Sequence, residues 1–478
     1  MSSTKYDLVI IGSGPGGYVS AIRAAQLGMK TAVIERDNPG GVCLNWGCIP
    51  SKAIIKCAEV YNYFQNAGDY GISHKGLSFD YSKVIDKSRG ASSALNKGVE
   101  FLLKKNKIDL IKGSAKLLRP GAVGIVGDED SEIRSQKIML ATGSVPRTIP
   151  GMEIDGKIVM TSDEAIMNRS VPKNIVIIGG GYIGVEFAYV YNSFGSKVTI
   201  VEMAPNIIPG ADEDVSKELE KNFKKSGMEV LTSTAYKSIK KTKSGAKVTV
   251  EDTASKEEKV LSAEIVLVAI GRKAVANSAP TSFSFYGSGD PLGLDELGIE
   301  LDEQGFIKTD ENYATTCSGV YAIGDVNGPP LLAHKASDEG VVAVERMNGL
   351  DTRVHYNNIP GCVYCQPEVA TVGLTEKQAK DDGYNLSIGT FPFKAVGKAV
   401  AVGETEGFVK IISNKDNGEI LGAHIIGHGA TELIAELGTA KTLESTPYEI
   451  ATTSHAHPTL SEAVMEAALS AMGRQRNF

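Results

Sequence analysis

The sequence predicts an α/β fold with two Rossmann-like dinucleotide-binding domains and a C-terminal α+β domain. A pattern of strand, glycine turn, helix and strand occurs twice along the chain. Toward the C-terminus, the alternating segments GFVKIIS and EILGAHIIG precede the helical segment ATELIAELGTAKTL. The length of 478 residues also exceeds what one hydrophobic core accommodates and indicates about three domains.

The first repeated unit spans residues 7–36, DLVIIGSGPGGYVSAIRAAQLGMKTAVIER. Its glycine turn contains Gly12, Gly14 and Gly17, and Glu35 follows the first glycine by 23 residues at the end of the second strand. Such glycines allow the backbone to approach a pyrophosphate, whose charge the helix N-terminus stabilises. A glutamate in this place accepts a hydrogen bond from a ribose hydroxyl. The unit therefore predicts one nucleotide site.

The second unit spans residues 174–203 and repeats the same spacing, with Glu202 again 23 residues after the first glycine. Its glycines are Gly179, Gly181 and Gly184. A single pattern of this kind also occurs in tight turns with close helix packing. Two complete units with identical spacing favour a second nucleotide site.

Two further segments resemble each other and indicate the domain boundaries. Residues 137–147 contain an apolar strand followed by Thr142 and Gly143, and residues 264–274 contain one followed by Gly271. Each segment is expected to return the chain from its nucleotide domain. The expected regions are 1–150, 151–273, a central segment 274–345 that completes the first domain, and 346–478.

Asp325 follows Gly324 after a short strand in the central segment. In this position Asp325 can accept a hydrogen bond from a cofactor hydroxyl. The alternative is an aspartate that only completes a turn at the end of the strand.

Cys43 and Cys48 lie in GGVCLNWGCIPSK, residues 40–52. In an unbroken helix five residues rise about 7.5 Å, which is more than the roughly 4.4–6.8 Å between the Cα atoms of a disulfide. We therefore expect a distorted turn at Gly47. Cys48 lies nearer the start of the following helix, whose dipole favours a thiolate.

The chemistry of this cysteine pair has three candidate interpretations. A zinc site requires further cysteine or histidine ligands, and none follows in this segment. A structural disulfide framework is disfavoured because six cysteines are sparse in a chain of this length. A redox pair is the preferred interpretation.

A candidate acid–base group occurs near the C-terminus in TSHAHPTLSEAVMEA, residues 453–467. Thiol–disulfide chemistry requires a proton acceptor, and Glu462 can orient the imidazole of His457 if the chain turns at Pro458. His455 is the less favoured base. The alternative for the whole segment is a surface loop that caps a helix.

Taken together, these motifs resemble those of the flavin-dependent pyridine nucleotide–disulfide oxidoreductases over nearly the whole chain. The resemblance implies that the first unit binds FAD and the second binds NAD. It implies that Cys43 meets the substrate, that Cys48 contacts the flavin, and that His457 is a base paired with Glu462. The other residues expected beside the flavin are Lys52, its partner Glu186, Thr142, Gly143 and Asp325.

The resemblance also implies an activity and an assembly. The expected reaction is the oxidation of dihydrolipoamide to lipoamide, with NAD as the final electron acceptor. The C-terminal domain is expected to form a homodimer and to deliver His457 into the partner's site. The expected partners are the lipoyl domains of 2-oxo acid dehydrogenase complexes or of the glycine cleavage system.

Several alternatives differ from this expectation. A related NADH-dependent reductase with another disulfide substrate is the most serious, because no short motif identifies lipoamide. A glutathione-type reductase that uses NADPH is disfavoured, since Met203, Ala204 and Pro205 stand where basic residues would contact a 2′-phosphate. The final residues GRQRNF lack the cysteines of a mercuric-type reductase. A nucleotide-binding regulatory subunit without catalysis is disfavoured by the complete set of cysteines, histidine and glutamate.

Composition limits the partners and the compartment. The net charge of −7 gives no support to nucleic-acid binding. The sequence has no run of 18 apolar residues, so we expect no membrane span. The first strand begins near Tyr6, which favours a cytoplasmic protein, although a mature organellar protein has the same appearance.

Three features have no assigned role. Trp46, the only tryptophan, lies between the two cysteines and either alters access to them or packs against the domain. Cys362 and Cys365 form a CxxC pattern that we interpret as buried thiols. Residues 281–298 resemble a loop with a small insertion.

Overall fold

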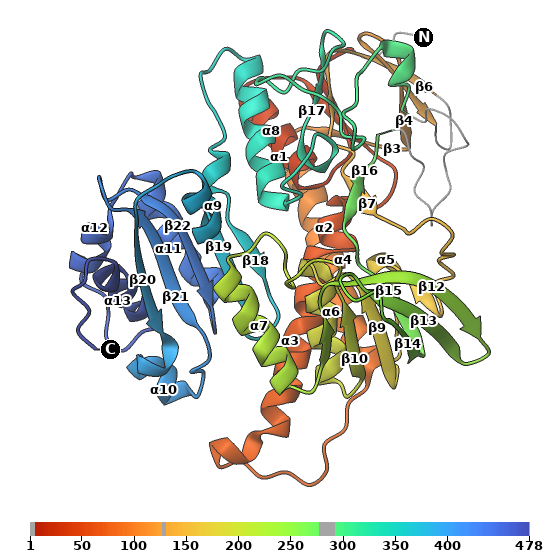
Figure 1. Cartoon of the computed structure of the whole chain (residues 1–478). Helices are drawn as coiled ribbons and strands as arrows, with labels where there is room; N and C mark the ends of the chain where they lie inside the picture. Colours follow the sequence, from red (N-terminus) through yellow and green to blue (C-terminus); the bar gives the residue numbers. More distant parts are fainter. Residues whose placement is uncertain (1–4, 127–130, 277–291, 478) are drawn as a thin grey trace.

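The computed structural model describes residues 5–126, 131–276 and 292–477 (Figure 1). The first sheet has seven strands in the order β3-β2-β1-β6-β5-β4, and β17 pairs with β6. The strands β1, β2, β3, β6 and β17 form parallel pairs, whereas β4 and β5 are antiparallel additions. Their bounds are β1 Lys5–Ile11, β2 Thr31–Glu35, β3 Asp109–Lys112, β4 Ser114–Arg119, β5 Ala122–Val126, β6 Ser131–Leu140 and β17 Val320–Ala322.

Helices from distant parts of the sequence surround this sheet. Helix α1 packs against α8, so the central segment supplies both a strand and a helix to the first domain. The segment after β2 forms α2, α3 and α4, and α3 reaches toward the second domain (Figure 1). The bounds are α1 Pro15–Gln26, α2 Gly41–Asn45, α3 Cys48–Gln65, α4 Tyr81–Lys105 and α8 Ala333–Met347.

The second sheet is parallel throughout and has the strand order β11-β10-β9-β15-β8. Its strands are β8 Val159–Met160, β9 Asn174–Ile178, β10 Lys197–Val201, β11 Glu229–Leu231 and β15 Ile265–Val268. Its helices are α5 Ser162–Ala165, α6 Tyr182–Ser193 and α7 Glu213–Lys225. An antiparallel meander packs beside it, formed by β12 Thr234–Thr242, β13 Gly245–Asp252 and β14 Glu258–Ala263.

The two nucleotide domains are joined by a short antiparallel pair of strands, β7 Ser144–Pro146 and β16 Arg272–Ala274. These are the segments where the apolar strands β6 and β15 end. The pair brings the two returning segments of the chain side by side, directly before the central segment begins.

The third sheet is antiparallel, in the order β18-β19-β22-β21-β20. Helix α13 lies so close to β20 that a Cβ atom on Gly389 would overlap the Ala467 carbonyl. The strands are β18 Gly361–Val363, β19 Val369–Gly373, β20 Leu386–Pro392, β21 Phe408–Asn414 and β22 Ile420–Ile426. The helices are α9 Glu376–Asp381, α10 Gly397–Val402, α11 Ala430–Thr442, α12 Pro447–Thr452 and α13 Glu462–Ala471.

A buried ion cluster joins the second and third sheets. The Lys410 side chain on β21 is 2% exposed and its Nζ lies 2.9 Å from Asp212 and 2.6 Å from Asp214, at the start of α7. Glu376 of α9 lies 2.6 Å from the same ammonium group. The cluster therefore fixes α7 against the C-terminal domain.

Two expectations concern regions that the structure describes only in part. Of the unassigned loop 281–298, residues 281–291 lie outside the described residues, whereas Leu292 and Leu294 are buried in the core of the first domain. Among the described helices, none combines the length and the apolar character that crossing a membrane requires.

Candidate active site

The first glycine turn forms a cradle at the N-terminus of α1. Gly12 has a φ of +100°, and a Cβ atom there would overlap the Ala141 carbonyl. A Cβ atom on Gly17 would overlap the Gly12 carbonyl, which shows how closely α1 approaches β1. A Cβ atom on Gly14, in contrast, would meet no atom within 4 Å. The open side at Gly14 suits a pyrophosphate at the helix N-terminus.

The second glycine turn repeats this construction at the N-terminus of α6. Gly179 has a φ of +108° and faces the Ala269 carbonyl, and Gly184 faces the Gly179 carbonyl. Gly181 again has nothing within 4 Å of its Cβ position. Both cradles therefore leave the same side of the turn accessible.

The acidic residue of each unit is held by backbone amides. Glu35 accepts hydrogen bonds from the Ser13 and Asp37 amides, each at 2.9 Å. Glu202 accepts hydrogen bonds from the Gly180 and Ala204 amides, each at 2.7 Å. Each carboxylate is thereby fixed at the end of its strand, beside its glycine turn.

The central segment brings Asp325 to the junction of β7 and β16. The Ser144 hydroxyl donates to Asp325 Oδ2 at 2.5 Å and accepts a hydrogen bond from Arg272 Nε at 2.8 Å. Ser144 directly follows Thr142 and Gly143, which we expected near the cofactor, and Arg272 directly follows Gly271. Sequence reasoning missed Ser144 and Arg272, because only the pairing of β7 with β16 places them together.

Cys43 lies in α2, and Cys48 is the first residue of α3, so the helix is interrupted at Trp46 and Gly47. Both residues are free thiols, and the Cys43 thiol is hydrogen bonded to Cys48. This hydrogen bond and the positive charge of Lys52 outweigh burial and lower the pKa of Cys48 to about 7. The pKa of Cys43 is raised by the same hydrogen bond. Cys48 is therefore the thiol of the pair that ionises first.

Lys52, one turn after Cys48 on α3, pairs with Glu186 on α6. Its Nζ lies 2.9 Å and 3.0 Å from the two carboxylate oxygens. The Tyr364 amide donates to Glu186 Oε1 at 3.0 Å, and the Tyr364 ring centroid lies 4.3 Å from Lys52 Nζ. Three domains therefore meet at this ion pair.

Tyr364 also gives the CxxC pattern a structural context. It lies between Cys362 and Cys365, and the Cys365 side chain is fully buried. Burial raises the pKa of Cys365 and raises the pKa of Cys362 to about 11. Both groups thus stay protonated near neutral pH, in the segment that places Tyr364 on the Lys52–Glu186 pair.

His457 and Glu462 form a hydrogen-bonded pair, with 2.9 Å between Nδ1 and Oε1. Burial opposes ionisation of Glu462, but hydrogen bonds from His457 and the Thr459 amide lower the pKa of its carboxyl. The His457 side chain is 77% exposed, and no described contact joins it to Cys43 or Cys48 of the same chain. Within the described residues of one chain, the cysteine pair and the His457–Glu462 pair are therefore two halves of the expected site that do not contact each other.

His455 has a partner that sequence reasoning missed. Its Nε2 lies 2.8 Å from Glu436 on α11, and its Nδ1 lies 2.9 Å from the Thr453 carbonyl. Its side chain is only 5% exposed. His455 is therefore enclosed by its own domain, whereas His457 faces outward.

Trp46 is held by polar and cationic neighbours. Its Nε1 donates to Asp37 at 3.2 Å, and the Arg89 guanidinium lies 5.6 Å from its ring centroid. The Arg89 side chain also donates to the Asn45 carbonyl at 2.7 Å. Trp46 thus connects the segment before Cys43 to helix α4.

Comparison with known proteins identifies the family. Residues 6–340 match the family described as pyridine nucleotide-disulphide oxidoreductase, and residues 359–468 match its dimerisation domain. Dihydrolipoyl dehydrogenase of Bacillus subtilis is 43% identical, and the match covers 100% of this chain and 100% of the relative. Dihydrolipoyl dehydrogenase of Chlorobaculum parvum is 44% identical, and the match covers 98% of each chain.

A solved structure has the same architecture. It is the Cu(II) complex of HOCl-induced flavoprotein disulfide reductase RclA from Escherichia coli. It superposes with a TM-score of 0.84 and 26% identity, over 97% of this chain and 99% of the other. The fold class predicted from the sequence is confirmed. The chain belongs to the pyridine nucleotide-disulphide oxidoreductase family.

Proposed function

We propose that the protein is an NAD-dependent dihydrolipoyl dehydrogenase, which oxidises dihydrolipoamide to lipoamide and uses FAD and NAD. The observation that carries this proposal is the thiol pair beside the Lys52–Glu186 ion pair, between two glycine cradles. Relatives with this name match essentially the whole chain.

The first cradle fits FAD, since its open glycine turn and fixed glutamate offer sites for a pyrophosphate and a ribose. The second cradle fits NAD for the same reasons. When bound, FAD supplies the two-electron chemistry that connects a dithiol with a nicotinamide. The residues that would hold FAD are Gly12, Gly14, Gly17, Glu35, Lys52, Thr142, Gly143 and Asp325. Glu186 would stand beside the flavin as the partner of Lys52. The residues that would hold NAD are Gly179, Gly181, Gly184, Glu202 and Gly271.

The cysteines carry the thiol–disulfide exchange. In their oxidised form, a substrate thiolate attacks Cys43 Sγ, and the bond between the two cysteines breaks to leave Cys48 as a thiolate. The second substrate thiolate then attacks the substrate sulfur bound to Cys43, which releases lipoamide and the Cys43 thiolate. The substrate loses two electrons and the cysteine pair gains two. The nearby Lys52 ammonium stabilises the thiolate of Cys48.

His457 supplies the proton acceptor. Because Nδ1 is hydrogen bonded to Glu462, Nε2 is the atom that takes the proton from a substrate thiol, and the carboxylate stabilises the resulting imidazolium. The exposure of His457 and the dimerisation domain support a homodimer in which the histidine acts on the disulfide of the partner subunit.

The partners and the compartment follow from the same chemistry. We assign as partners the lipoyl domains of 2-oxo acid dehydrogenase complexes or of the glycine cleavage system. A working dithiol and only six cysteines suit a reducing compartment, which supports a cytoplasmic location or the equivalent for a mature organellar form.

The test is an NADH-consumption assay with lipoamide, glutathione disulfide and other disulfides in parallel. The purified protein should be yellow, release one FAD per chain on denaturation, and reduce lipoamide fastest. Cys43→Ser and Cys48→Ser should each retain FAD and lose turnover. A protein that prefers another disulfide would be the related reductase instead. A folded protein that cannot take up FAD would contradict both.

A further inference from the structure

A buried ion pair on α8 lies outside the cysteine centre and the glycine cradles. The side chains of Lys335 and Glu339 are each 1% exposed, and Nζ lies 3.2 Å from Oε1. Transferring two charges from water to the interior is costly unless further hydrogen bonds satisfy them. The positions of those hydrogen bonds therefore indicate what the pair holds.

Most of these hydrogen bonds lead to one turn of the chain. Lys335 Nζ donates to the Gly324 carbonyl at 3.0 Å, to the Gly328 carbonyl at 2.8 Å and to Asn327 Oδ1 at 2.9 Å. Glu339 Oε2 accepts a hydrogen bond from the Gly324 amide at 2.7 Å. Both backbone polar groups of Gly324 are thus bound by the two members of the pair.

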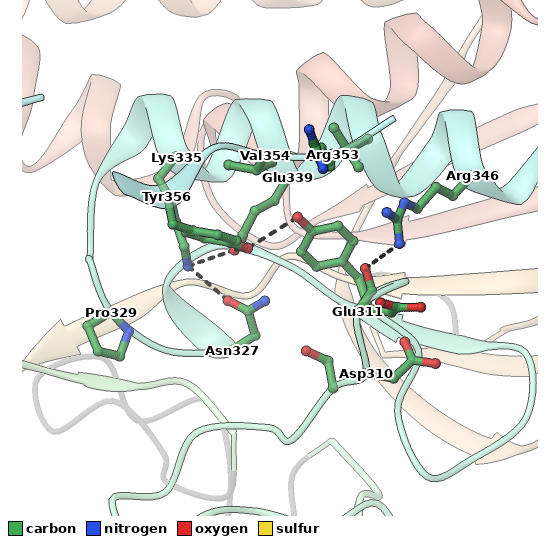
Figure 2. A pocket seen from close by; sticks show the side chains of 13 residues that line it. Asp310, Glu311, Asn327, Pro329, Lys335, Glu339, Arg346, Arg353, Val354 and Tyr356 are labelled. Carbon is green, nitrogen blue, oxygen red and sulfur yellow. Dashed lines mark hydrogen bonds and ion pairs between the residues drawn. The ribbon is translucent and has the colours of Figure 1, made fainter. Parts of the chain in front are cut away.

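The outer end of the pair is closed by tyrosines. Tyr356 donates to Glu339 Oε1 at 2.6 Å, and the hydroxyls of Tyr356 and Tyr313 lie 3.1 Å apart. These groups line a cavity of about 490 Å³ (Figure 2). Figure 2 shows Lys335, Glu339 and Tyr356 converging at one side of this cavity, with Asn327 below them.

The residue after Gly324 is Asp325, whose Oδ2 is already bound by Ser144. Gly324 has a φ of +78°, and a Cβ atom there would lie 3.0 Å from the Ala336 side chain. The turn before Asp325 is therefore held by α8, and the Asp325 carboxylate is held by β7. Within the described residues, the hydrogen bond that the Asp325 carboxylate accepts comes from Ser144 and goes to Oδ2.

We propose that Lys335 and Glu339 are positioning residues that clamp Gly324, so that Asp325 is fixed in place to accept a hydrogen bond from bound FAD. This proposal rests on the proposed function, in which Asp325 contacts FAD. A purely structural pair would stabilise the packing of α8 without a specific link to Asp325.

A double-mutant cycle separates these two roles. FAD is removed from the full-length protein, and its dissociation constant is measured by fluorescence titration for the unaltered protein, Glu339→Gln, Asp325→Asn and the double variant. Glu339→Gln is isosteric and should weaken FAD binding about tenfold, as expected for a lost charge-assisted hydrogen bond. In the Asp325→Asn background the same change should cost less than about threefold, because the two residues act together.

Two further measurements make the result specific. Hydrogen exchange of the peptide that covers residues 320–328 should accelerate in Glu339→Gln, which reports that the clamp has opened. Lys410→Met removes a buried lysine from another domain; it should lower thermal stability and leave the FAD dissociation constant unchanged. Should Glu339→Gln fail to fold, Tyr356→Phe takes its place in the cycle, with a smaller loss expected.

Four outcomes would overturn the clamp. The first is an unchanged FAD dissociation constant in Glu339→Gln or its substitute Tyr356→Phe. The second is that Glu339→Gln changes the FAD dissociation constant by the same factor in the unaltered protein and in Asp325→Asn. That result would show that the ion pair has a structural role only. The third is an unaltered protein that binds no FAD, which would refute the proposed function together with the clamp. If FAD binds but Asp325→Asn has no effect, the clamp alone fails.

Discussion

At the scale of single residues, Glu202 is the side chain on which nucleotide choice depends in our proposal. Two backbone amides fix its carboxylate at the end of β10. A fixed acceptor forms a hydrogen bond with a ribose hydroxyl at little entropic cost, and its charge repels a 2′-phosphate.

Glu202→Ala should therefore lower kcat/KM for NAD and reduce the preference of the enzyme for NAD over NADP. The loss of one charge-assisted hydrogen bond is worth roughly 1.5–3 kcal/mol, which corresponds to a tenfold to hundredfold change. The measurement is the ratio of kcat/KM for the two nucleotides. Glu229→Ala, at the start of the neighbouring strand β11, removes a carboxylate from the same sheet and should leave the ratio unchanged. A ratio that Glu202→Ala does not alter would show that this residue does not contact the ribose.

The pKa values of the six cysteines predict which thiol loses its proton first as the pH rises. Cys48 has a pKa lowered to about 7, whereas burial or a hydrogen bond raises the pKa of the other five cysteines. As the pH rises through 7, ultraviolet absorbance of the reduced, FAD-free protein should show one thiolate forming. Cys48→Ser should abolish this step.

The hydrogen bond from Cys43 provides a matched pair of variants for the same titration. Cys43→Ser keeps a hydroxyl donor and should preserve the low pKa of Cys48. Cys43→Ala removes the donor and should raise that pKa. If the two variants titrate alike, Lys52 and the helix dipole, rather than Cys43, control the ionisation of Cys48.

At the scale of the elements, the buried ammonium of Lys410 holds α7, α9 and β21 together. Lys410→Met leaves Asp212 buried without its cation, and such a change costs about 3–5 kcal/mol. The free energy of unfolding from urea denaturation should fall by that amount. Lys377→Met removes an exposed pair on α9 and should have little effect. Equal effects of the two variants would show that the buried cluster adds no more to the free energy of unfolding than an exposed ion pair does.

The elements also show how far the sequence determines the site. The cradles and their glutamates were predictable, because each lies within one continuous unit of strand, turn, helix and strand. The pairing of Lys52 with Glu186 followed from family resemblance alone, since the two residues are 134 positions apart. Ser144, Tyr364 and Lys335 have no local pattern at all. Their places depend on the pairing of β7 with β16, the approach of β18 to α6, and the packing of α8 on α1.

At the scale of the whole molecule, the proposed site requires two chains. Subunits with only Cys48→Ser and subunits with only His457→Ala should each be nearly inactive as homodimers. After dissociation and reassociation, the mixed dimer combines an intact Cys48 from one chain with an intact His457 from the other, and activity should return. Verified mixed dimers that remain at the activity of the parents would refute the shared site.

The outward orientation of His457 has a consequence for gene dosage. A chain that carries both Cys48→Ser and His457→Ala disables its own site and also withholds the histidine from a sound partner. If chains pair at random, the fraction of working sites equals the square of the fraction of unaltered chains. Equal amounts of unaltered and doubly altered chains therefore leave about a quarter of the sites working. A doubly defective copy would thus act as a dominant inhibitor, whereas a copy that fails to dimerise would only halve the supply.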